Sequence, residues 1–387
     1  MDWHYLDHAA GSPARPEVVA AMVPLLLEGF GNPSGAHALA RAARAELDEA
    51  RRRLGAVVGC QPGEVVFTSG GTEADDLAVR GTLGVHPGVA VCSAVEHHAV
   101  LHPVARAGGV TVPVDGRGVV DLAALADALH PDVALVSVVL VNNEVGTIQP
   151  LAAIAEVVRE RAPSAVLHTD ASQALAWLDL RVHAAPADLI TLASHKCGGP
   201  KGVGALVVRD GVRLEPQLIG GGQERERRSG TQHVAGAAGF AVAAERAAEE
   251  RDGLWARAAG WRARLVDAVL AEVDGALDSA VPAGGSGDHL VPGIVNLCLP
   301  EVESEALLFL LEHDHRVLAA AGSSCASGAQ DPSHVLAALG IDRTLARGSV
   351  RLSMGWSSTD DDVAAAVAGV PDAARRLQAH ARDGMPA

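Results

Sequence analysis

The chain has 387 residues, enough for about two domains and a large buried core. Its 31 basic and 47 acidic side chains give a formal net charge of −16, which argues against direct binding to nucleic acid or to an anionic membrane. The first residues lack the pattern of a signal peptide, and the longest apolar run is too short to span a membrane, so we expect a cytoplasmic protein. The five cysteines form no CxxC pair, which argues against a structural zinc site and a disulfide framework.

The first regular pattern is an amphipathic helix, because apolar residues from Leu39 to Val57 recur at steps of three and four. From about residue 60 to residue 210, short apolar runs alternate with helical patterns. Strands are expected at 64–67, 89–94, 110–114, 134–141, 165–170, 189–194 and 203–208, and helices between them at 122–130 and 151–162. Continuous apolar strands that alternate with helices are typical of a mostly parallel sheet covered on both faces.

The pattern changes after residue 210. A long alanine-rich helix is expected from about 233 to 275, and a loop at 282–293. A strand (IVNLCL), a helix (SEALLFLLEH), a further strand (VRLSM) and a final helix follow. We therefore expect a large α/β domain followed by a smaller α+β domain.

Several side chains fall near the ends of predicted strands, where ligands bind in such sheets. In FTSGGTEADD a strand, a glycine turn and a helix start could hold a phosphate through backbone N–H groups and the hydroxyl of Thr72. Asp170 could keep a pyridine nitrogen protonated, or it could simply cap a helix. Lys196 is a candidate for a Schiff base, although an isolated lysine in a turn is more often a surface residue. His97 or His98 could stack on a cofactor ring and move protons, or could be structural.

The segment AGSSCASGAQ surrounds Cys325 with small residues. Structural cysteines usually lie among larger apolar residues, where they act as small hydrophobes. A thiol among glycine, serine and alanine instead suits a mobile loop that carries a nucleophile.

In chain order these features are a phosphate turn, a histidine, an aspartate and a lysine. The sequence resembles the cysteine desulfurases of the NifS/IscS type, in the class V aminotransferase group of fold-type I enzymes, which use pyridoxal 5'-phosphate (PLP). The resemblance runs from residue 5 to residue 355 and rests on FGNPSGAH, SGGTEADD, VEHHAV, VNNEVGTIQP, HTDASQ, SHKCGGPKG, GGGQERERRSGTQ and GSSCASG. It implies a large PLP-binding α/β domain over 16–260 and a small α+β domain over 261–387, which the N-terminal segment 1–15 joins.

The resemblance also implies a role for each matching residue. Lys196 would hold the cofactor covalently, His97 would stack on its ring and act in catalysis, and Asp170 would pair with the ring nitrogen. Further cofactor contacts would come from Gly71, Thr72, Asn143, Gln173, His195 and, from a second subunit, Thr231. Ala193 replaces a serine that usually contacts phosphate, and Ser194 could compensate. Asn32 and Arg351 would hold the substrate carboxylate, and no metal is expected.

Cys325 lies at the position of the family's nucleophile. It would take the sulfur of L-cysteine as a persulfide, leaving L-alanine, and pass it to an acceptor protein, such as an iron–sulfur scaffold or a tRNA thiolase. The resemblance further implies a homodimer, and Cys197 is expected to be a packed, inert thiol. The alternatives are a selenocysteine lyase or another PLP-dependent C–S lyase, and a non-catalytic sulfur-relay or scaffold protein that kept the fold.

Overall fold

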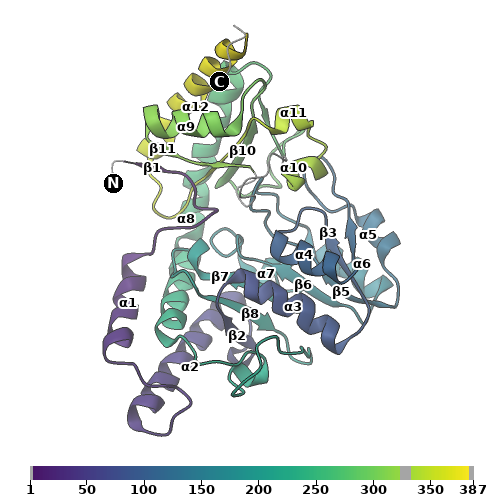
Figure 1. The fold of residues 1–387 in the computed structure, drawn as a ribbon, viewed down its shortest axis with the longest axis vertical. Helices are drawn as coiled ribbons and strands as arrows, with labels where there is room; N and C mark the ends of the chain where they lie inside the picture. Colours follow the sequence, from purple (N-terminus) through teal and green to yellow (C-terminus); the bar gives the residue numbers. More distant parts are fainter. Residues whose placement is uncertain (1–2, 323–332, 383–387) are drawn as a thin grey trace.

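A seven-stranded sheet forms the centre of the larger part of the molecule in the computed structural model, which describes residues 3–322 and 333–382 (Figure 1). The strand order is β2-β8-β7-β6-β5-β3-β4, and β8 alone runs in the direction opposite to the other six strands. The strands are β2 (Val65–Thr68), β3 (Val89–Ser93), β4 (Val110–Val112), β5 (Val133–Ser137), β6 (Val166–Asp170), β7 (Leu189–Ala193) and β8 (Gly204–Val208). The predicted α/β fold with a mostly parallel sheet is therefore confirmed.

Helices cover both faces of this sheet, and successive residues of each strand alternate between two cores. Leu206 and Val208 of β8 pack on the face of α3 (Gly71–Val85) and α4 (His98–Arg106), whereas Val207 belongs to the core on the other face. That second core also contains residues of α2 (Ala38–Val58), α6 (Leu151–Arg161), α7 (Leu180–His183) and α8 (Val234–Glu272). A short helix, α5 (Leu122–Ala128), packs beside α6.

A second, antiparallel sheet lies in the smaller part of the molecule. Its order is β12 (Ala320–Ala321), β13 (Ser349–Ser353), β10 (Ile294–Cys298) and β9 (Leu277–Asp278). The helix α9 (Ser304–His315) packs beside it, and α12 (Asp360–Arg382) packs on α9. Two short helices, α10 (His334–Ala338) and α11 (Arg343–Ala346), connect β12 to β13. Near the N-terminus, β1 (His4–Tyr5) pairs in parallel with β11 (Val317–Leu318).

The helix α8 runs along both parts of the molecule (Figure 1). It packs against α1 (Pro16–Leu27) and α2 at one end and against α12 at the other. The domain boundary expected at residue 260 falls inside this helix, and the division into 1–15, 16–260 and 261–387 stays a prediction. Among the described residues, no helix is long and apolar enough to cross a membrane.

Two features differ from the sequence-based expectations. The helix α1 was not predicted, because its apolar residues are distributed around the helix rather than along one side: Val18 is buried, while Val19, Val23, Leu26 and Leu27 are exposed. The strand expected at 134–141 ends at Ser137, and residues 138–141 continue as an irregular segment.

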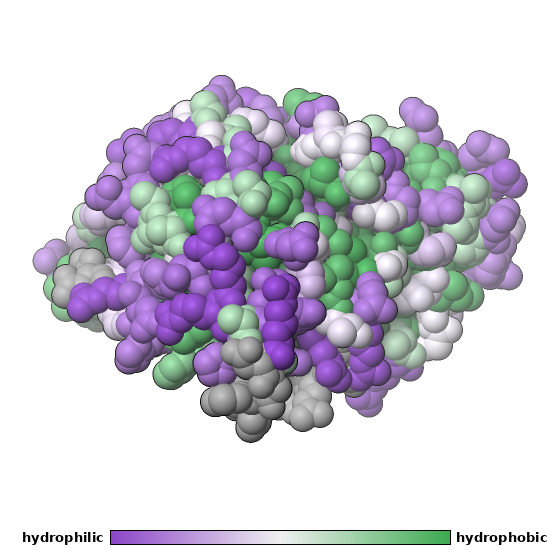
Figure 2. All heavy atoms as spheres, turned by 90° about the horizontal axis from the view of Figure 1, so that it is seen from above, coloured by the Kyte–Doolittle hydropathy of each residue, from purple (hydrophilic) through white to green (hydrophobic). Residues whose placement is uncertain are grey.

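Seen from the C-terminal end of α12, hydrophilic side chains cover much of the rim and hydrophobic ones gather toward the middle (Figure 2).

Candidate active site

A cavity of about 350 Å³ lies where the parallel strands end and the two parts of the molecule meet. Its position follows the general rule that ligands bind at the carboxyl ends of the strands in open α/β sheets. Most of the predicted site residues line it, namely Gly71, Thr72, His97, Asn143, Asp170, Gln173, His195, Lys196 and Arg351. Other residues that line the cavity were not expected from the sequence, among them Asp7, Ala9, Ala10 and Ser172.

One end of the cavity is rich in hydrogen-bond donors. The helix α3 begins there at Gly71, directly after the turn that follows β2, so its first N–H groups face the same region as the hydroxyls of Thr72 and Ser172. Gly204 lets β8 approach this turn, since a Cβ atom at that position would lie 2.5 Å from the Gly70 carbonyl carbon. Burial lowers the pKa of His195 to about 4, aided by nearby Lys196, so its imidazole is neutral and can donate an N–H. Together these groups suit a phosphate.

The middle of the cavity holds a carboxylate and an imidazole. Asp170 ends β6 and is 7% exposed, and its Oδ1 accepts the N–H of Ser172 at 2.8 Å. His97 caps α4 through Nδ1, which accepts the N–H of Ala99 at 3.1 Å and so leaves the ring proton on Nε2. Burial lowers the pKa of His97, against the opposing effect of Asp170. Of the two adjacent histidines, His97 lines the cavity, whereas the His98 ring lies 4.7 Å from the ring of His334.

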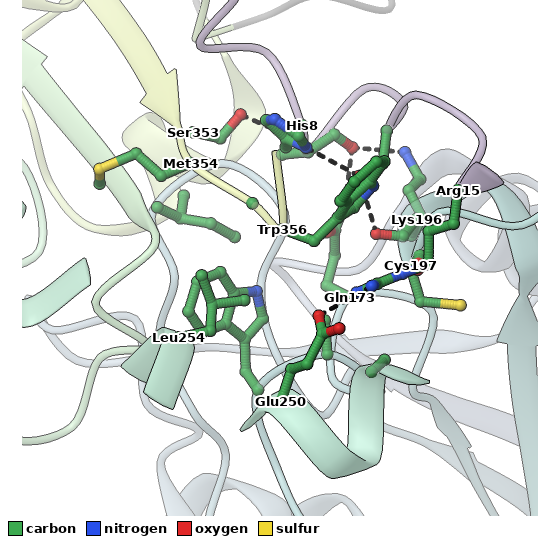
Figure 3. A pocket seen from close by; sticks show the side chains of 17 residues that line it. His8, Arg15, Gln173, Lys196, Cys197, Glu250, Leu254, Ser353, Met354 and Trp356 are labelled. Atoms are coloured by element: carbon green, nitrogen blue, oxygen red, sulfur yellow. Dashed lines mark hydrogen bonds and ion pairs between the residues drawn. The ribbon is translucent and has the colours of Figure 1, made fainter. Parts of the chain in front are cut away.

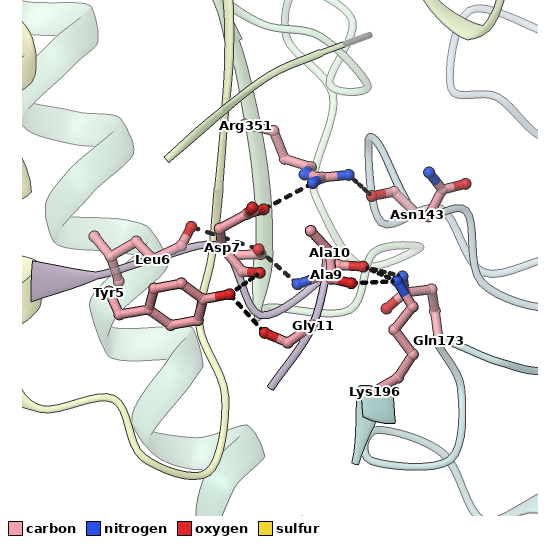
Figure 4. A network of polar contacts seen from close by, with 11 residues as sticks. Tyr5, Leu6, Asp7, Ala9, Ala10, Gly11, Asn143, Gln173, Lys196 and Arg351 are labelled. Atoms are coloured by element: carbon pink, nitrogen blue, oxygen red, sulfur yellow. Dashed lines mark hydrogen bonds and ion pairs between the residues drawn. The ribbon is translucent and has the colours of Figure 1, made fainter. Parts of the chain in front are cut away.

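Lys196 follows β7 and extends toward the N-terminal segment (Figures 3 and 4). Its Nζ donates to the carbonyl oxygen of Ala10 at 3.0 Å and also to that of Ala9. The Nε2 of Gln173 donates to the same Ala9 carbonyl at 2.8 Å. The N-terminal segment therefore contacts the cavity mainly through backbone oxygens.

Arg351 extends from β13 into the opposite end of the cavity (Figure 4). It is 1% exposed, and its guanidinium donates to Asp7 Oδ1 at 2.8 Å and to the carbonyl oxygen of Asn143 at 3.0 Å. Among the described residues, no acceptor contacts its Nε. A buried guanidinium with an unsatisfied N–H is suited to bind a planar anion such as a carboxylate.

Three of the predicted site residues that the structure describes, Asn32, Thr231 and Ser194, do not line this cavity. Asn32 is exposed in the loop between α1 and α2, where its Oδ1 accepts the N–H of Ser34 at 2.9 Å. Thr231 is also exposed. Ser194 is buried, and its hydroxyl lies 2.0 Å from where a Cβ at Gly199 would be, which does not favour a cofactor contact. Cys325 lies outside the described residues, and all four roles stay predictions.

The cysteines that the structure describes are buried or partly buried free thiols. Cys197, next to Lys196, is 2% exposed, and burial raises its pKa to about 12, so it remains a protonated thiol near neutral pH. This placement agrees with the expectation that Cys197 is inert. Burial likewise raises the pKa of Cys60 to about 12 and that of Cys298 to about 11. Within the described ranges, no group of three or more His, Cys, Asp or Glu side chains is arranged to hold a metal ion.

Comparisons with known proteins find relatives that cover most of the chain. The family model for aminotransferase class-V matches residues 4–365. The IscS-like cysteine desulfurase of Mycobacterium tuberculosis is 42% identical over 389 residues, which cover 97% of each chain. A solved structure of a NifS-like protein has a TM-score of 0.87 and 30% identity, covering 95% of this chain and 98% of that one. A structure of SspA in complex with cysteine has a TM-score of 0.78 and 30% identity, covering 90% and 98%.

Proposed function

This chain belongs to the aminotransferase class-V family, and from that premise we propose that it is a PLP-dependent cysteine desulfurase. It converts L-cysteine to L-alanine and carries the sulfur as a persulfide on Cys325. The observation that carries the proposal is one cavity that brings together Lys196, Asp170 and Arg351. The amine can attach the cofactor covalently, the carboxylate can pair with the cofactor's ring nitrogen, and the buried guanidinium can bind the carboxylate of an amino acid.

The residues of the cavity fit PLP. Its phosphate would lie at the donor-rich end, at Gly71, Thr72 and His195. Asp170 would hold the ring nitrogen protonated, and Lys196 would bind the cofactor covalently. Asn143 and Gln173 would contact the ring oxygen. When bound, PLP supplies an electron-withdrawing ring that weakens the bonds at the Cα atom of an amino acid.

The chain's own groups then orient the substrate and hold its protons. Arg351 would bind the substrate carboxylate through its guanidinium, which its bonds to Asp7 and to the Asn143 carbonyl keep fixed. His97, kept neutral by its lowered pKa, can donate a hydrogen bond from Nε2–H, and it would act as a base only after Nδ1 releases the Ala99 N–H. The thiolate of Cys325 would attack the substrate sulfur, forming one S–S bond as the C–S bond breaks. The bonding electrons stay on Cβ, which takes up a proton to become the methyl group of alanine.

The experiment that tests this function measures alanine formed from L-cysteine by the PLP-loaded protein and by Arg351→Lys. The wild type should form alanine, and the variant should show a KM about tenfold higher or more, because lysine lacks the bidentate fork of arginine; tenfold corresponds to roughly 1.4 kcal/mol. Cofactor content should be equal in both proteins. No alanine from the wild type, or an unchanged KM, would contradict the proposal. A far higher rate on L-selenocysteine would favour the lyase alternative.

The proposal includes a homodimer and a sulfur-acceptor protein. Exposed apolar side chains gather on α1 and the loop after it, including Val19, Val23, Leu26, Leu27 and Phe30. A concentration of exposed apolar residues of this kind is typical of a subunit interface. A native mass of two chains of 39.5 kDa in light scattering would support the dimer, and a monomeric mass would contradict it. The acceptor is proposed as a protein rather than a nucleic acid, because the chain is acidic.

A further inference from the structure

The turn that carries Lys196 is hydrogen-bonded along its length to the N-terminal segment. The four successive carbonyl oxygens of residues 195–198 accept, in order, the Ser12 N–H at 2.9 Å, the Ser12 hydroxyl at 3.1 Å, the Arg15 Nε at 3.1 Å and the Arg15 N–H at 2.8 Å. Two residues therefore supply a partner to every carbonyl of the turn. These contacts join positions more than 180 residues apart in the sequence.

The Arg15 side chain is itself held from three sides (Figure 3). It is 3% exposed, its Nη1 donates to Glu250 of α8 at 2.7 Å, and its guanidinium lies 4.8 Å from the centre of the Trp356 ring. The indole N–H of Trp356 donates to the Pro13 carbonyl at 3.0 Å. A guanidinium fixed in this way loses little freedom when it also bonds to the turn.

The turn depends on this packing for its shape. Gly198 has a φ of 90°, in the left-handed region that favours glycine, and a Cβ there would lie 2.7 Å from Arg15 Cγ. Within the turn, the N–H groups of Cys197 and Gly199 donate to the Ser194 carbonyl at 3.2 and 3.0 Å. These two internal bonds share one acceptor and leave the carbonyls of residues 195–198 to partners outside the turn, so the turn depends on those partners for its shape.

We infer that Arg15 is a positioning residue for Lys196: it holds the carbonyl groups of Cys197 and Gly198, directly after the lysine, so that the lysine amine faces the cavity. The same N-terminal segment bonds to the opposite end of the site, through Asp7 to Arg351 and through the Ala9 N–H to Ser353 Oγ at 2.8 Å. The segment thus fixes the amine and the substrate-binding guanidinium relative to each other. The inference rests on the proposed function only in giving Lys196 the cofactor.

Hydrogen exchange of the cofactor-free chain tests this role directly. In Arg15→Ala, amide exchange in the peptide covering 194–204 should be about tenfold faster or more, because a charge-assisted hydrogen bond to the turn is lost. The matched control is Arg53→Ala, which removes a bond of 2.9 Å to Glu245 of the same helix α8. It should leave exchange in 194–204 unchanged. Equal exchange of this peptide in wild type and Arg15→Ala, or equal acceleration in both variants, would overturn the inference.

A conservative variant separates positioning from general stability. Arg15→Lys keeps a positive charge toward Glu250 but lacks the Nε donor, so it should unfold at a temperature near that of the wild type while the 194–204 peptide still exchanges faster. Full protection of the turn in Arg15→Lys would overturn the inference. In the PLP-loaded protein, the pH midpoint of the visible cofactor band should shift in both Arg15 variants and not in Arg53→Ala. If the wild type binds no PLP, the proposed function fails while the exchange result still decides the role of Arg15.

Discussion

Replacing Lys196 by alanine should abolish the visible absorption that a covalently bound PLP gives to the purified protein, together with alanine formation from L-cysteine. The chain contains two lysines, Lys196 and Lys201, and of these Lys196 lines the cavity. No second lysine lines the cavity, so the expected loss is complete. Absorption spectra and borohydride reduction followed by peptide mapping measure the effect.

The matched control for this prediction is Lys201→Ala. Lys201 is exposed, five residues after Lys196 in the same glycine-rich segment, so its removal should leave both the spectrum and the rate nearly unchanged. In the wild type, the reduced cofactor should map to the peptide with Lys196. A cofactor trapped on Lys201, or a normal lysine-type absorption band in Lys196→Ala, would show that the site has been assigned to the wrong residue.

The site residues that could be predicted from the sequence are those that lie at or just after the end of a strand. Lys196 and Asp170 lie just beyond or at the end of adjacent parallel strands, and the carboxyl ends of such strands meet at one edge of the sheet. The N-terminal contribution could not be predicted in the same way. Ala9 and Ala10 contact Lys196 through their carbonyl oxygens, and a backbone acceptor leaves no signal in the residue type.

Contacts between single residues far apart in the sequence could not be predicted from the sequence either. Arg15 precedes Pro16 at the start of α1, where the local pattern indicates no more than a helix start. Its bonds to the lysine turn and to α8 depend on how distant segments pack, and the hydrophobic periodicity of the sequence gives no information on that packing. Asn32 is exposed and does not line the cavity, so its expected contact with the substrate stays a prediction.

Cys325→Ser should separate the two halves of the proposed reaction. The hydroxyl of serine does not ionise near neutral pH and cannot accept sulfur as a thiolate does, so alanine and sulfide formation should fall to near background. Lys196, Asp170 and His97 are unchanged, so PLP should still bind and L-cysteine should still alter its spectrum. Rapid-quench measurement of alanine and of the persulfide on the chain would show the separation.

The cysteines that the structure describes are poorly suited to replace Cys325, so activity in Cys325→Ser would contradict its proposed role. Cys197 is the one nearest to the lysine, but it is buried, its Sγ donates to the Ser194 carbonyl at 3.2 Å, and its pKa of about 12 leaves almost no thiolate at neutral pH. Cys197→Ser should therefore keep both steps nearly intact. Mass spectrometry after a single turnover should find the added sulfur on the peptide with Cys325. Sulfur on Cys197, or full activity in Cys325→Ser, would mean that a buried thiol becomes exposed and ionised during turnover, and the proposed role of Cys325 would be wrong.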